Sequence, residues 1–149
     1  MHDLFLYEDG AVWACGYNTL RQLGANHVFN EILDVPVRVE GLSEVKTISA
    51  GGVFSLALKQ DGSVLAWGCN EHGELGTGSS DESSKMTAID MKNEPVEVPM
   101  LRDVVEISAG NTHAMAVTSD GGIWTWGEND EGQLGDFYGN ERSVPQRIM

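Results

Sequence analysis

The chain has 149 residues, of which 41% are hydrophobic and 21% are charged, a composition typical of a folded domain rather than a disordered or fibrous chain. Nine Lys and Arg residues stand against 23 Asp and Glu residues, which gives a formal net charge of -14. Such a surface repels a phosphate backbone, so we expect no direct binding of nucleic acid and partners that are basic or neutral.

Neither a membrane span nor a secretory signal is predicted, because apolar runs are only a handful of residues long and no positively charged segment precedes one. Cys15 and Cys69 have no CxxC spacing and no histidine cluster beside them, which excludes a disulfide framework or a zinc site. Two free thiols are typical of a reducing compartment. The sequence therefore predicts a cytoplasmic protein, with the nucleus as the alternative.

Three segments of sixteen residues align without a gap: 9–24, 61–76 and 120–135. Each opens with Asp-Gly, has a Gly seven positions later and an Asn two positions after that, and closes with Leu-Gly. The strand-like segment 45–58 likewise matches 104–117, with Ile-Ser-Ala-Gly identical in both. An internal repeat of this length determines the choice of fold, so it takes precedence over local secondary-structure signals.

The repeats divide the chain into units of approximately 1–41, 42–100 and 101–149 within one domain, 1–149. We expect the first and last units to be incomplete, because Met1 aligns with Val53, in the middle of a repeat. The Asp-Gly dipeptides lie 52 and then 59 residues apart, so the second unit has seven extra residues. These fall between Gly76 and Pro95 and predict an insertion at the surface.

Each unit has the pattern of a small antiparallel sheet. Residues 54–58 and 63–67 are short runs rich in branched and aromatic side chains, joined through Asp61-Gly62, a dipeptide that supplies the positive backbone angles of a tight hairpin. Leu65 and Trp67 alternate with Val64 and Ala66, so both faces of the strand are apolar and each needs a neighbouring layer. Such units stack around an axis, which predicts an all-β partial β-propeller of about three four-stranded blades.

The order of these motifs resembles the repeat of the regulator of chromosome condensation family. It runs Ser-Ala-Gly, His, an apolar strand, Asp-Gly, Trp-x-Trp-Gly, x-Asn and Gln-Leu-Gly, as in residues 108–135. The resemblance implies a propeller fold, with seven blades in the complete family ring, whereas this chain has slightly under three repeats. It implies no single activity, because members include exchange factors for guanine nucleotides, ubiquitin-ligase scaffolds, secreted bacterial proteins and an inhibitor of β-lactamase.

A residue present in every repeat is expected to serve every blade, whereas an active site is built once. The recurring Asp, Asn and Gly residues are therefore interpreted as turn formers. His2 and His113 share a position with Phe54, which favours a packed, hydrogen-bonding ring over a catalytic base. His27 and His72 have no catalytic or metal-ligand partner at a recognisable spacing. We therefore predict no enzymatic activity and no cofactor or metal.

Three non-recurring segments remain as candidates for a binding surface: the insertion 77–94, the loop 25–34, and an aromatic pair after the third Leu-Gly. For the aromatic pair two interpretations stay open, an exposed anchor for a partner or a pair folded back onto the blade. For the insertion, a surface loop without a role is the favoured interpretation. The residues predicted to contact a partner are Asp81, Glu82, Glu94, Asp136, Phe137 and Tyr138.

The favoured function is a non-enzymatic propeller module for protein–protein interaction or scaffolding, whose acidic loops contact another protein. The alternative, implied only by the family resemblance, is guanine-nucleotide exchange on a small GTPase, with residues 77–94 as the protruding loop. Basic protein surfaces such as those of histones are a further class of partner. Because three blades leave an open axis, we expect the chain to be either a segment of a longer propeller or part of a homo-oligomer.

Overall fold

The computed structural model describes residues 1–25, 31–78 and 91–149, and these residues form eleven β-strands. In chain order the strands are β1 (His2–Leu6), β2 (Val12–Tyr17), β3 (Ile32–Arg38), β4 (Val45–Ala50), β5 (Phe54–Lys59), β6 (Val64–Cys69), β7 (Met91–Glu97), β8 (Val104–Ala109), β9 (His113–Thr118), β10 (Ile123–Gly127) and β11 (Arg142–Arg147). The described part of the chain contains no helix that could cross a membrane.

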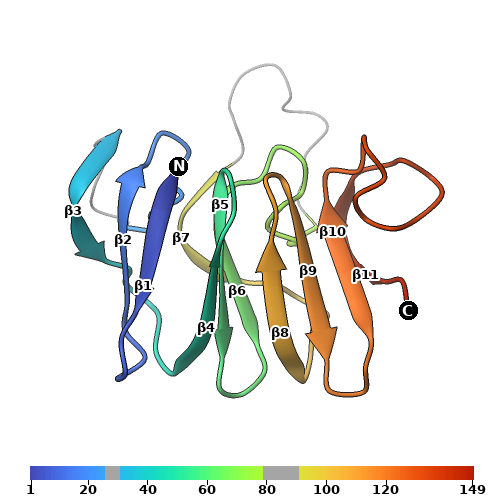
Figure 1. Cartoon of the computed structure of the whole chain (residues 1–149), viewed down its shortest axis with the longest axis horizontal. Helices are drawn as coiled ribbons and strands as arrows, with labels where there is room; N and C mark the ends of the chain where they lie inside the picture. Colours follow the sequence, from blue (N-terminus) through green and yellow to red (C-terminus); the bar gives the residue numbers. More distant parts are fainter. Residues whose placement is uncertain (26–30, 79–90) are drawn as a thin grey trace.

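The strands form three antiparallel sheets that stand side by side like the blades of an open fan (Figure 1). The first blade has the order β1-β2-β3, the second β4-β5-β6-β7, and the third β8-β9-β10-β11. The predicted all-β partial propeller is confirmed. The first blade has three strands rather than four, since no described strand pairs with the free edge of β1. The boundaries of the sequence units stay a prediction.

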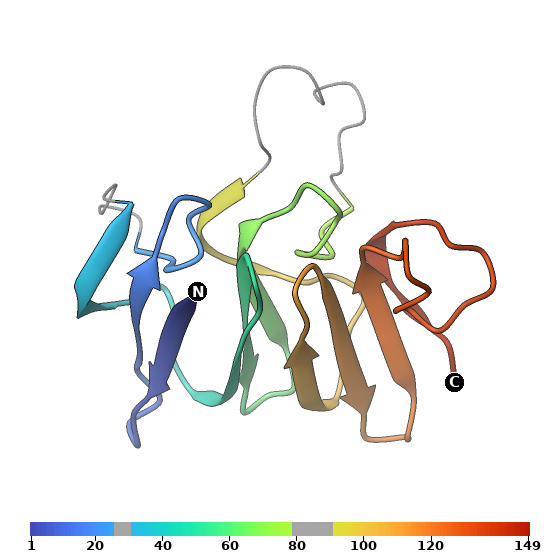
Figure 2. The ribbon, with the colours of Figure 1, turned by 45° about the horizontal axis from the view of Figure 1, so that its top comes forward.

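The connections between strands divide over two rims of the fan. The hairpin rim holds the tight turns β1–β2, β5–β6 and β9–β10 together with the links from one blade to the next. The loop rim holds the β10–β11 connection and the described parts of the β2–β3 and β6–β7 connections, residues 18–25 and 70–78, which Figure 2 shows at one side of the molecule. Variation between repeats in length and composition is therefore concentrated on the loop rim.

The Asp-Gly hairpin differs from the predicted turn in one respect. Gly62 has a φ of 82°, but Asp61 is not among the residues with positive φ. The Asp61 carboxylate instead accepts a hydrogen bond from the backbone N–H of Ser63 at 3.0 Å, while Lys59 N–H donates to the Ser63 carbonyl at 2.9 Å. The turn thus needs left-handed geometry only at its glycine, and the aspartate closes it through its side chain.

The second blade is covered on both faces, as its sequence predicts. Leu56, Leu58 and Val64 pack towards the third blade in one cluster, whereas Ala57 and Trp67 pack towards the first blade in another. Every side chain named here is fully buried. The core of the protein is consequently two apolar layers between three sheets, and its outer blades each have one uncovered face.

One tryptophan joins the second blade to the first, and another joins the third blade to the second. Trp67 Nε1–H donates to the backbone carbonyl of Gln22 at 2.9 Å, and Trp126 Nε1–H donates to that of Glu74 at 2.7 Å. Both carbonyls belong to the loop just before Leu-Gly in the preceding repeat. A Cβ atom added at Gly24 would lie 2.7 Å from Trp67 Nε1, so only glycine lets the loop approach the indole this closely.

At the first junction a histidine extends this contact. The Ser55 hydroxyl donates to the same Gln22 carbonyl at 2.8 Å, and His2 Nε2 lies 2.7 Å from Ser55 Oγ. Because the serine proton is directed to Gln22, His2 Nε2 must carry the proton and donate to Ser55. Burial, with a smaller effect of the chain's amino terminus, lowers the pKa of His2 to about 4, so the ring stays neutral. The predicted packed histidine is thus found at this position.

The two junctions should respond differently to loss of the indole N–H. Glu74 has no hydroxyl donor opposite its carbonyl, since Ala114 occupies the position of Ser55, so Trp126→Phe leaves a buried acceptor without a hydrogen bond. We expect this variant to lower the free energy of unfolding by about 1–3 kcal/mol, and Trp67→Phe by less. Urea unfolding followed by far-ultraviolet circular dichroism measures both.

Trp13→Phe is the matched control, because Trp13 is only half-buried and lies on the uncovered face of the first blade. Equal losses of stability for all three variants would show that indole size, and not the cross-blade hydrogen bond, stabilises the junctions.

Candidate functional site

The aromatic pair predicted as a binding anchor lies in the β10–β11 loop of the third blade and is exposed. Phe137 has a fully exposed side chain, and Tyr138 is 78% exposed. Of the two interpretations left open by the sequence, folding back onto the blade is excluded. Among the described residues of the loop rim, Phe137 and Tyr138 are adjacent, exposed aromatic side chains.

The loop that presents these aromatics is held by Asp136. Its carboxylate accepts hydrogen bonds from Arg142 Nε at 2.8 Å, from Asn129 Nδ2 at 2.7 Å and from the backbone N–H of Tyr138 at 3.2 Å, and Arg142 Nη2 also contacts it. The hydrogen bonds from Arg142 lower the pKa of Asp136 to about 2, despite an opposing effect of burial. Asp136 therefore fixes the base of the loop, and the aromatics project from a defined support.

The surroundings of the aromatic pair are acidic. Residues 128–142 contain five carboxylates and one guanidinium, and that guanidinium is bound to Asp136. Asp130, Glu131 and Glu141 are exposed. We call residues 128–142, which carry the exposed Phe137 and Tyr138, the acidic aromatic loop. Its charge favours a positively charged partner surface.

The other predicted contact residues are not gathered with this pair. Asp81 and Glu82 lie outside the described residues. Glu94 is exposed in β7, the outer strand of the second blade, whereas Asp136, Phe137 and Tyr138 belong to the third blade. Among the described residues, the candidate surface thus consists of the acidic aromatic loop, and the inclusion of Glu94 stays a prediction.

His72, for which no partner was predicted from the sequence, links the acidic aromatic loop to the second blade. His72 Nδ1 lies 2.8 Å from Glu141 Oε1, and the backbone N–H of Gly78 donates to the Ser143 carbonyl at 2.8 Å. Partial burial lowers the pKa of His72, but hydrogen bonding to Glu141 and nearby carboxylates outweigh it, and the net shift is upward. The partners are 69 residues apart, so only the stacking of blades reveals them.

Among the described residues, Glu74 is the only buried carboxylate, and it lies at the junction of the second and third blades. It is fully buried, accepts a hydrogen bond from the backbone N–H of His72 at 2.9 Å through Oε2, and has no hydrogen-bond partner at Oε1. The equivalent residues, Gln22 and Gln133, make the same local hydrogen bond with an amide oxygen. Burial raises the pKa of Glu74 to about 7.

This carboxyl should make stability depend on pH. The folded protein binds the proton of Glu74 more tightly than the unfolded chain, whose value is near 4.5, so stability falls as pH rises from about 4.5 to about 7. Glu74→Gln should remove this loss and raise the free energy of unfolding at pH 8 by about 1–3 kcal/mol. Denaturant unfolding of both proteins from about pH 4.5 to about pH 8 measures the difference.

The wild-type protein and Glu74→Gln must be compared at each pH, because His2 is present in both and changes stability with pH in the opposite direction to Glu74. Its lowered pKa makes stability rise with pH between about 4 and 6.5. Gln22→Glu, at an equally buried position, should cause a second loss of stability at high pH. Gln133→Glu should change the stability little, because position 133 is only half-buried. A wild-type protein with the pH profile of Glu74→Gln would contradict the assignment.

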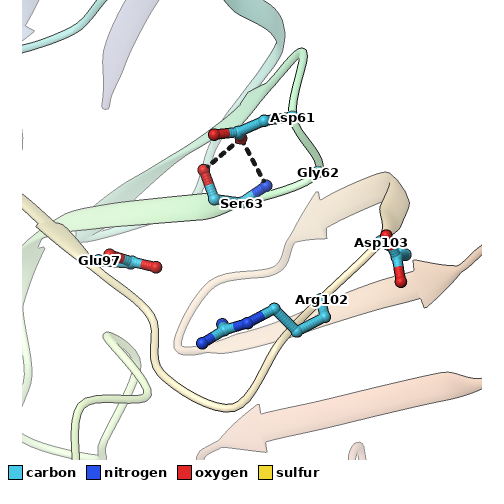
Figure 3. A pocket seen from close by; sticks show the side chains of 6 residues that line it. All are labelled: Asp61, Gly62, Ser63, Glu97, Arg102 and Asp103. Carbon is cyan, nitrogen blue, oxygen red and sulfur yellow. Dashed lines mark hydrogen bonds between the residues drawn. The ribbon is translucent and has the colours of Figure 1, made fainter.

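A small polar cavity lies at the hairpin rim between the second and third blades (Figure 3). Its volume is about 280 Å³, and Asp61, Gly62, Ser63, Glu97, Arg102 and Asp103 line it. Arg102 Nη1 donates to the carbonyl of Leu101, and the Ser63 hydroxyl donates to Asp61 Oδ1 at 2.6 Å (Figure 3). Over the residues that the structure describes, no group of three His, Cys, Asp or Glu side chains is arranged to hold a metal ion.

The two cysteines are free thiols in the structure, as the sequence predicts. Cys69 is buried, and burial raises the pKa of its thiol to about 12, so the reactive thiolate is suppressed. Cys15 is half-buried in β2.

These features, stacked antiparallel blades with indole contacts between them and a variable loop rim, define a β-propeller repeat protein. One family model of the Regulator of chromosome condensation (RCC1) repeat matches residues 9–58, 61–117 and 120–149. A second model of the repeat matches residues 45–74 and 104–133. The chain belongs to the RCC1 repeat family, which confirms the resemblance seen in the sequence.

The human E3 ubiquitin-protein ligase HERC2 is 34% identical to this chain over 150 residues, which are 97% of this chain and 3% of HERC2. The yeast RCC1 protein Prp20, solved in complex with Kap60, superposes with a TM-score of 0.88 at 24% identity, covering 99% of this chain and 35% of that one. A second structure, of Prp20p from Saccharomyces cerevisiae, gives a TM-score of 0.84 at 24% identity, with 99% and 36% covered. The chain thus spans a minor part of each of these relatives.

Proposed function

We propose that this chain is a non-enzymatic propeller module for protein–protein interaction, and that the acidic aromatic loop binds a basic protein surface. The observation that carries the proposal is the full exposure of Phe137, next to Tyr138, on a loop fixed by Asp136. A rigid aromatic anchor needs little ordering on binding, and the carboxylates around it attract positive charge.

The relatives agree with a module of this kind. The structure of Prp20p is described together with its binding to Gsp1p and histones, and histones are strongly basic proteins. For the present chain, a basic partner fits the net charge of -14 and the five carboxylates of residues 128–142. The scaffolding role is likewise consistent with RCC1 repeats lying within a much longer ubiquitin ligase.

Purified core histones are a suitable probe, with binding measured by biolayer interferometry at several salt concentrations. We expect Phe137→Ser with Tyr138→Ser to weaken binding about tenfold or more, because both anchors are removed. Wild-type binding should weaken with added salt, as expected for complementary charges.

Met100→Asn is the matched control. Met100 is an exposed apolar residue on the opposite rim, and its φ of 71° is one that asparagine tolerates. The proposal fails if wild-type protein does not bind histones, or if the double aromatic variant binds them as well as Met100→Asn does.

Guanine-nucleotide exchange on a small GTPase is the second candidate, supported by the family resemblance. An exchange factor needs no nucleophile, since it stabilises the nucleotide-free form of its partner. The segment proposed to protrude, residues 77–94, falls mostly outside the described residues. Release of labelled GDP from a panel of small GTPases tests this candidate, and no acceleration at saturating protein would discard it.

A further inference from the structure

The loops of the second and third blades meet at a contact between two titratable side chains. His72 Nδ1 lies 2.8 Å from Glu141 Oε1, and the two side chains are 34% and 35% exposed. The backbones of the loops are held together independently of this pair, because Gly78 N–H donates to the Ser143 carbonyl at 2.8 Å. A Cβ atom added at Gly73 would lie only 2.6 Å from Ser143 Cα. A change of charge on His72 therefore alters the electrostatics of the acidic aromatic loop without separating the two loops.

This pair does not recur at the junction of the first and second blades. The aligned repeats have Leu20 at the position of His72. The pairing of the outer strands places Met91 at the position of Glu141. Both titratable side chains thus replace apolar ones, and they do so at the same junction. A role in building each blade does not explain the pair, because such a role would recur with the blades.

Carboxylates face His72 from both blades. Glu74 lies on the same loop and accepts the His72 backbone N–H, whereas Glu141 and Glu128 belong to the third blade. Glu71 precedes His72 in the chain. Partial burial by itself would lower the pKa of His72, but the hydrogen bond to Glu141 and the neighbouring carboxylate charges raise it above its ordinary value of 6.5. The ring therefore gains or loses its charge close to neutral pH.

Protonation of His72 changes what Glu141 offers to a binding partner. The imidazolium forms an ion pair with Glu141 and cancels its charge, so the loop loses part of its attraction for a basic surface. The neutral ring still donates its Nδ1–H to Glu141 but adds no charge, so the carboxylate keeps its full negative charge. Asp136 cannot respond in this way, because it is already paired with Arg142.

We propose that His72 regulates the acidic aromatic loop, so that a basic partner binds more tightly as the pH rises and the imidazolium releases Glu141. This regulation rests on the proposed function, the binding of a basic protein surface by the same loop. The imidazolium also repels a basic surface directly through its own charge. Both effects have the same sign, and both disappear when the ring is neutral.

Histone binding measured from about pH 5.5 to about pH 8.5 at one low salt concentration tests the regulation. We expect the wild-type dissociation constant to fall about two- to fivefold over this range, as is usual for an exposed charge pair. His72→Gln keeps an amide donor for Glu141 but cannot be protonated, so it should bind tightly at both limits. Glu141→Gln removes the regulated charge, so it should bind weakly at both limits.

Glu74→Gln is the matched control, because Glu74 is fully buried and titrates in the same range of pH. This variant should keep the pH dependence of binding and move its midpoint to lower pH, since a carboxylate that favours the imidazolium is lost. Comparison of each variant with the wild type at the same pH cancels any titration of the histones themselves. Circular dichroism at each pH checks that every variant is folded.

A measurement without a partner tests the contact itself. Proton NMR titration should give His72 a lower pKa in Glu141→Gln than in the wild type, because the hydrogen bond and the charge of Glu141 are lost. A wild-type protein that binds histones at neither limit of pH contradicts the proposed function and the regulation together. Wild-type binding that is independent of pH, or equally dependent on pH in His72→Gln, contradicts the regulation alone. An unchanged titration of His72 in Glu141→Gln does the same.

Discussion

The stacking of this protein depends on one directed hydrogen bond, from the indole N–H of a blade to a loop carbonyl of the blade before it. Trp67 and Trp126 make this bond from the same repeat position, and each is fully buried. The bond fixes the height of one sheet against the next, because the donor is in a strand and the acceptor is in a loop at the rim. The glycine of Leu-Gly is needed for the same contact, since a side chain there would displace the indole.

The geometry of the loop rim depends on this contact. The carbonyl that accepts the Trp126 bond belongs to Glu74, whose side chain binds the backbone of His72, and His72 pairs with Glu141 at the base of the acidic aromatic loop. A chain of short interactions thus runs from the buried junction to the exposed aromatic residues. The binding surface that we propose is consequently supported by the blade junction as well as by Asp136 within its own loop.

The internal repeat made the fold predictable, because a pattern repeated three times reports strands, turns and buried faces independently of any single weak signal. The positive φ predicted for Asp61 was wrong, because residue type alone does not show that the aspartate closes the turn through its side chain. The contact between His72 and Glu141 could not be predicted from the sequence, because it joins two loops of different repeats. Glu74 could have been found, since it replaces the glutamine of the two other repeats. The exposure of Phe137 depended on the Asp136 contacts, which the sequence does not specify.

The indole contact also gives the stack a direction. A blade offers a loop carbonyl on one face and receives support through its tryptophan on the other, so the two sides of every blade are chemically unlike. Gln133 holds the acceptor position in the third blade, whereas the donor position in the first blade is held by Cys15. Each described junction is therefore polar, because the donor belongs to the later blade of the pair and the acceptor to the earlier one.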